Sequence, residues 1–103
     1  MNKFAREVSM SIAEILKQAG ASETLALREH ATLLALSKMS RYESECALFE
    51  KKYGQTFQSF QNQIMALHNE EDFQAEDDLM DWEFAQEALN WWKEKLEDIN
   101  RAV

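Results

Sequence analysis

Acidic side chains are the most concentrated chemically active groups in this sequence. Eight acids and no base lie between Glu70 and Glu83, whereas eleven acids balance eleven bases in the rest of the chain. This one segment therefore carries the whole formal net charge of −8. Clustered carboxylates suit either a divalent cation or a positively charged partner.

Three of these acids, Asp77, Asp78 and Asp81, have the spacing of half a magnesium site. All-helical nucleotide pyrophosphohydrolases hold magnesium with carboxylates one helical turn apart, contributed by two helices. The second set is missing, because the glutamates within residues 43–50 lack that spacing. A magnesium-dependent pyrophosphohydrolase therefore remains a third hypothesis, behind two that are not catalytic.

The remaining nucleophiles and metal ligands form no recognisable constellation. His30 and His68 belong to no E-x-x-H or H-E-x-x-H pair, and Cys46 has no histidine at helical spacing. The sequence also lacks a glycine-rich phosphate loop and the aspartate spacing of a calcium loop. We therefore expect no catalytic residue, no metal site and no cofactor, and an inert, buried Cys46 thiol.

The composition predicts an all-α protein. There is no proline and there are only two glycines in 103 residues, too few for the turns of a β-sandwich or barrel. A chain of this length and apolar content can bury one core, so we expect residues 1–103 to form a single helical domain. Apolar spacing, the helix-ending residues Gly20 and Gly54, and the N-cap residues Ser22 and Thr56 predict helices over about residues 3–18, 23–53 and 57–67, a loop at 68–72, and a last helix that begins between 74 and 78.

Two of these helices carry regular apolar seams with alternating spacings of three and four. In the helix over 23–53 the seam contains Ala35, Met39, Tyr42, Cys46, Phe49 and Tyr53. In the last helix it contains Trp82, Ala85, Leu89, Trp92, Leu96, Ile99 and Val103. Such seams are typical of coiled coils, so we predict a small bundle of three to four helices in which the two long helices form an antiparallel, coiled-coil-like pair.

The last helix carries a second apolar stripe, formed by Met80, Phe84, Ala88 and Trp91. At 100° per residue, the two stripes together span an arc of about 200°, which a single neighbouring helix cannot cover. In the simplest interpretation both stripes belong to the core. In the alternative interpretation, part of the arc is offered to a partner or to a second copy of the chain.

Several functions and locations are disfavoured by the composition. The acidic balance argues against direct nucleic-acid binding, because nucleic-acid binders present clustered Lys and Arg. The break at residues 19–22 has the length of a helix-turn-helix turn, but the following helix opens with Glu23. No segment is apolar enough to cross a membrane and no signal-peptide pattern opens the chain. With a single cysteine, the composition fits a cytoplasmic protein.

The second half of the chain resembles the small acidic helical antitoxins of prokaryotic type II toxin–antitoxin pairs. The resemblance rests on E-C-A-x-F-E-x-K-Y-G at residues 45–54, on E-D-D-L-M-D-W-E-F-A at residues 76–85, and on the helix with Trp91 and Trp92. It implies a protein that binds a basic toxin, often a ribonuclease, and covers its active site. Many such antitoxins also carry a DNA-binding part, which this sequence does not display.

Our leading hypothesis is a non-catalytic module that binds a basic protein, most specifically a ribonuclease-type toxin, through an acidic and aromatic C-terminal helix. The alternative is a structural homodimer that pairs through the last helix. The acids of the last helix would steer a basic partner, and its outer apolar residues would anchor it. The predicted partner-binding residues are Asp77, Asp78, Met80, Asp81, Glu83, Phe84 and Trp91.

Overall fold

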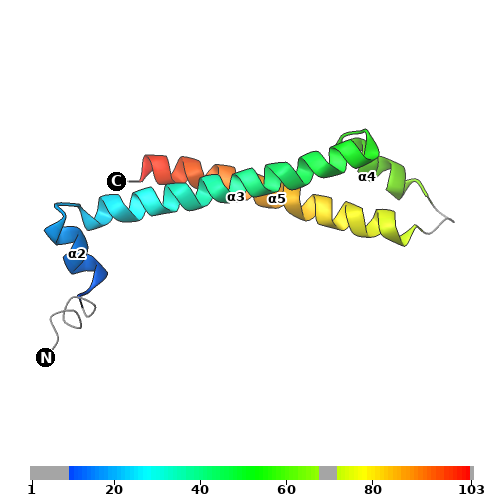
Figure 1. Cartoon of the computed structure of the whole chain (residues 1–103). Coiled ribbons are helices and arrows are strands. Elements are labelled where there is room, and N and C mark those ends of the chain that lie inside the picture. Colours follow the sequence, from blue (N-terminus) through cyan, green and yellow to red (C-terminus); the bar gives the residue numbers. More distant parts are fainter. Residues whose placement is uncertain (1–9, 68–71, 103) are drawn as a thin grey trace, which may run out of the picture. The chain divides into compact units, whose positions relative to one another are not determined.

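The computed structural model describes residues 10–67 and 72–102, which form four α-helices and no strand (Figure 1). These are α2 (Ile12–Gln18), α3 (Glu23–Tyr53), α4 (Phe57–Met65) and α5 (Phe73–Arg101). The prediction of a small all-α bundle is confirmed. The described helices include none that is both long enough and apolar enough to span a membrane.

The chain groups into two compact units that divide after Leu33, within α3. In the first unit, α2 begins where the Ser11 hydroxyl accepts a hydrogen bond from the backbone N–H of Glu14. The prediction of one continuous helix over residues 3–18 is therefore wrong at Ser11, because the backbone of Ser11 is extended and its side chain caps α2. The proposed start of that helix, at Lys3, lies outside the described residues. That residues 1–103 form a single helical domain stays a prediction.

Glycine and capping residues set the ends of the helices where the sequence predicts them. Gly20 and Gly54 both have positive φ, 75° and 63°, which glycine adopts without steric cost. Gly20 follows α2, and the Ser22 hydroxyl then caps α3 by accepting from the N–H of Leu25 at 3.3 Å. Gly54 follows α3, and Thr56 caps α4 in the same way.

The second unit is built on an antiparallel pairing of the later part of α3 with α5. Successive contacts run in opposite directions along the two helices: Tyr42 meets Phe84, Phe49 meets Trp82, and Lys52 meets Asp78. The short α4 adds the buried Phe60 to this pair. The buried residues of the cluster are Tyr42, Cys46, Phe60, Ala75, Trp82, Ala85 and Leu89.

Trp82 is the centre of this core and is completely buried. Its ring stacks on Phe49, with centroids 5.7 Å apart, and contacts Phe57 and Phe60 at 5.6 Å. The Trp82 indole N–H has no hydrogen-bond partner among the described residues, which costs about 1–3 kcal/mol. Burial of the Trp82 ring offsets that cost, because tryptophan has a large apolar surface that is removed from water here.

Both predicted seams face this core. On α3, Met39, Phe49 and Tyr53 pack against the buried cluster, and on α5 Trp92 does the same. Leu96 and Ile99 are half-buried, and Val103 lies outside the described residues. The seam of α5 therefore identifies the inward face of this helix.

Candidate functional site

Helix α5 begins at Phe73, slightly earlier than predicted, because Asp72 caps it. The Asp72 carboxylate accepts a hydrogen bond from the N–H of Ala75 at 3.1 Å. A carboxylate at this position also interacts favourably with the positive end of the helix dipole. The early start adds Phe73 to the helix and to its exposed apolar side.

Four large apolar side chains lie exposed along α5 on the side away from the core. Their exposed fractions are 68% for Phe73, 68% for Met80, 62% for Phe84 and 50% for Trp91. At 100° per residue they fall within about 40° of one line, roughly opposite Trp82. We call these four residues the outward face. Isolated exposed apolar residues are common on proteins, whereas large exposed apolar patches are typical of interaction sites.

Two members of the outward face are held by neighbouring rings. Phe84 meets the edge of Tyr42 on α3, with centroids 6.0 Å apart. Trp91 meets the edge of Trp92 at 4.9 Å, and the ammonium group of Lys95 lies 5.2 Å from its ring centroid. These contacts limit the rotation of both rings, so less side-chain entropy is lost when a partner covers them.

A row of four glutamates borders the outward face on one side. Glu76, Glu83, Glu87 and Glu94 repeat the seven, four, seven spacing of the apolar row, three residues further along. All four are exposed, and none is hydrogen-bonded or ion-paired to another residue within 10–67 and 72–102. We call these residues the glutamate row. Their full charge is available to a partner.

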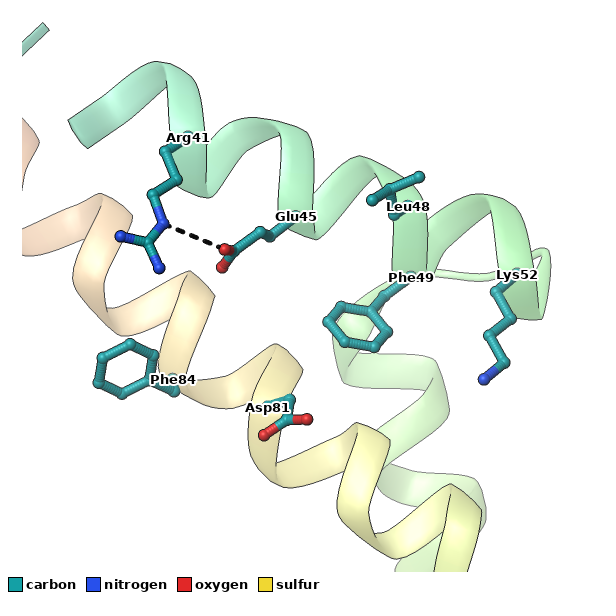
Figure 2. A pocket seen from close by; sticks show the side chains of 7 residues that line it. All are labelled: Arg41, Glu45, Leu48, Phe49, Lys52, Asp81 and Phe84. Carbon is teal, nitrogen blue, oxygen red and sulfur yellow. Dashed lines mark hydrogen bonds and ion pairs between the residues drawn. The ribbon is translucent and has the colours of Figure 1, made fainter. Parts of the chain in front are cut away.

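The other border of the outward face is formed by Asp77 and Asp81, which are also exposed. Beside Asp81, a groove of about 420 Å³ separates α5 from α3. Figure 2 shows the side chains that line it, with two from α5 and the others from α3. The lining residues are Arg41, Glu45, Leu48, Phe49, Lys52, Asp81 and Phe84.

Asp78 is the one predicted partner-binding residue that the structure turns inward. Only 6% of it is exposed, and its carboxylate accepts hydrogen bonds from Lys52 at 2.5 Å, from Gln74 at 3.1 Å and from the Tyr53 hydroxyl. The bond from Lys52, followed by that from Tyr53, holds the pKa of Asp78 below its usual value. A carboxylate saturated in this way cannot steer a partner, so we remove Asp78 from the candidate surface.

The pairing of Asp78 takes one of the three aspartates of the magnesium hypothesis out of a possible site. Asp78 points toward α3, whereas Asp77 and Asp81 face solvent. In the part of the chain that the structure describes, no three His, Cys, Asp or Glu side chains converge on a possible metal position. Of the two histidines, His30 is exposed and His68 lies outside the described residues.

Cys46 is a free, buried thiol on the inward seam of α3. Burial raises the pKa of this thiol, and the negative charges of Glu50 and Glu45 raise it further. Since the thiolate is the reactive form, a raised pKa makes the group a poor nucleophile. The expectation of a buried Cys46 is confirmed.

Sequence reasoning missed part of this surface. Glu87 and Glu94 lie beyond the acidic segment, yet a helical projection of α5 would have placed them in line with Glu83. The groove could not be predicted, because it depends on how α3 and α5 pair.

No family model, curated protein or solved structure matches this chain. What the surface can bind therefore follows from its own contacts, charges and exposure.

Proposed function

We propose that this chain is a non-catalytic module that binds a positively charged protein through α5. The observation that carries the proposal is the outward face bordered by exposed acids on both sides. An apolar centre inside a charged border is the usual anatomy of a protein interface. The acids speed association with a basic partner, and the large side chains supply most of the binding energy.

The partner's complementary surface follows from the dimensions of this face. From Phe73 to Trp91 the helix rises about 27 Å, at 1.5 Å per residue. A matching partner offers an apolar groove of that length for one side of a helix, as in other helix-in-groove complexes. Lys and Arg along the rim of this groove would meet the glutamate row.

Self-association through the same face is the second candidate, and one observation favours it. The outward face is symmetric about Trp82, so that an antiparallel copy would place Phe73 against Trp91 and Met80 against Phe84. The charges oppose it, however. In that pairing the glutamate row of one copy lies along the glutamate row of the other, and like charges repel. We therefore favour a basic partner over a second copy.

In its most specific form, the proposal is that the partner is a small basic ribonuclease-type toxin and that this chain is its antitoxin. The resemblance of residues 45–54 and 76–85 to antitoxins supports this form. The exposed acids would occupy positions on the toxin that otherwise bind nucleic-acid phosphates. We place the pair in the cytoplasm, where a single free cysteine such as Cys46 stays reduced.

Charge reversal on the acidic borders tests the proposal. The purified chain and its variant Asp77→Lys/Asp81→Lys/Glu83→Lys are immobilised, and the proteins that each captures from the native cell are identified. We expect wild type to capture a basic protein that the variant loses. With that protein purified, the association rate should fall at least about tenfold in the variant, and wild-type association should slow steeply with salt.

A control variant with the same change of charge keeps this test specific. Glu14→Lys/Glu29→Lys/Glu43→Lys alters exposed acids that lie outside α5. The proposal requires this control to capture the basic protein as wild type does. Equal association rates for wild type and the α5 variant would refute it. Sedimentation of the pure chain tests the second candidate, which predicts a stable dimer that tightens with added salt.

A further inference from the structure

The groove between α3 and α5 offers a partner different contacts from those of the outward face. It is a recess rather than a ridge, and its walls combine apolar and charged groups. We propose that this groove binds an arginine side chain of the partner. This inference rests on the proposed function, because it assigns one specific contact to the same basic partner.

The apolar part of the groove can accept a hydrocarbon stem. Leu48 is 67% exposed and Phe84 is 62% exposed, so both have surface left to bury. Phe49 also lines the groove (Figure 2), and its ring is held in place by stacking on Trp82, with centroids 5.7 Å apart. A volume of about 420 Å³ is within the range of small-ligand pockets and exceeds that of one large side chain.

The charges of the groove favour a cation over an anion. Both cations that line it are already paired, Arg41 with Glu45 at 3.3 Å and Lys52 with Asp78 at 2.5 Å. Asp81 has no such pairing within the described residues. The free charge of the groove is therefore one carboxylate, on the same helix and one turn from the exposed ring of Phe84.

Arginine fits this combination better than lysine does. A guanidinium group donates two parallel hydrogen bonds to one carboxylate, and its flat face stacks on an aromatic ring. Asp81 supplies the carboxylate and Phe84 supplies the ring. Lysine keeps only the point charge, since its ammonium group is compact, strongly hydrated and unable to form the paired bonds.

Titration with short peptides tests the groove without the natural partner. We would add acetyl-Gly-Arg-Gly-amide to the ¹⁵N-labelled chain and follow backbone amide shifts by NMR. Saturable shifts are expected at the lining residues of α3 and α5. The same peptide with lysine, or with the neutral isostere citrulline, should bind at least about fivefold more weakly. Equal binding of the citrulline peptide would overturn the proposal.

Two variants locate the contact. Asp81→Asn keeps the size of the side chain but removes its charge, and should weaken arginine-peptide binding about fivefold or more. Glu43→Gln makes the same chemical change at an exposed acid of α3 that does not line the groove, and should leave binding unchanged. An equal loss in both variants would mean a diffuse attraction to negative charge and would overturn the proposal.

The peptide titration and the capture experiment can fail separately. If the arginine peptide does not bind while the α5 charge reversal still abolishes capture, the module stands and the arginine contact is wrong. If the peptide binds as expected while capture is unaffected, the groove can bind arginine but does not hold an arginine of the partner, because the capture variant carries Asp81→Lys. Both the proposed function and its arginine contact would then be wrong.

Discussion

The two sides of α5 are similar in sequence and opposite in structure. Each carries tryptophan and other large apolar groups at helical spacing, and each has aspartates in the first turns. On the inward side Trp82 is fully buried and Asp78 is paired, whereas on the outward side Trp91 is half exposed and Asp81 has no ion pair among the described residues. Residue type alone therefore does not separate the core of this protein from its candidate interface. The contacts made by α3 and α4 do.

Replacement of the two tryptophans should give the largest contrast. Trp82→Ala removes the centre of the aromatic core, and we expect it to lower the free energy of unfolding by about 3–5 kcal/mol. Trp91→Ala should lower it by less than about 1 kcal/mol, because half of that ring is already in water. Urea unfolding followed by circular dichroism measures both. Similar losses in the two variants would mean that the outward face is part of the core.

Replacement of Asp78 should lower the free energy of unfolding more than replacement of Asp81 does. The difference should be smaller than that between the two tryptophans. Asp78→Ala leaves the Tyr53 hydroxyl without its acceptor in a partly buried position, so we expect a loss of about 1–3 kcal/mol. Asp81→Ala removes an exposed carboxylate and should change stability by no more than about 0.5 kcal/mol. The same unfolding measurement applies, and a destabilising Asp81→Ala would point to a structural partner for that residue.

The free energy of unfolding should change with pH as the Asp78 carboxylate is protonated. Its pKa is lowered in the folded chain, chiefly by the hydrogen bond from Lys52, so its contribution is complete above the ordinary value of about 3.9. That contribution is lost as the pH falls through the lowered pKa of the folded state. Unfolding midpoints of wild type and Asp78→Asn should therefore converge as the pH is taken below about 4. A constant gap down to pH 2 would contradict the assignment.

The smallest effect is expected on the outward face itself. Met80→Gln replaces a side chain that is 68% exposed, so the free energy of unfolding should change by no more than about 0.5 kcal/mol and the melting temperature should change little. The same variant should nevertheless weaken capture of the basic partner, because the apolar Met80 side chain no longer contacts it. A clear drop in melting temperature would show that this part of the face is covered within the chain or by a second copy.

Much of the fold could be predicted from the sequence because helices are local. The spacing of apolar residues identified the inward seams of α3 and α5, and Gly20, Gly54 and Thr56 marked helix ends. The start of α2 at Ser11 was missed, since a serine cap inside an apolar pattern is easily taken for a helical residue. Of the residues predicted to bind a partner, Asp78 is buried and paired, whereas the other six are exposed.

The sequence by itself determined that the chain is helical, that α5 has two apolar sides, and that the net charge lies in one segment. It left open which side of α5 is buried. Only the tertiary structure showed that one side is covered and the other is exposed. Asp78 and Asp81 are one turn apart and chemically identical; Asp78 lies four residues before Trp82, in line with the seam, but its spacing alone does not supply hydrogen-bond partners. The difference arises because Lys52 and Tyr53, about 25 residues away, are brought to Asp78 by the pairing of α3 with α5. Which charge is neutralised and which is left for a partner depends on that long-range contact.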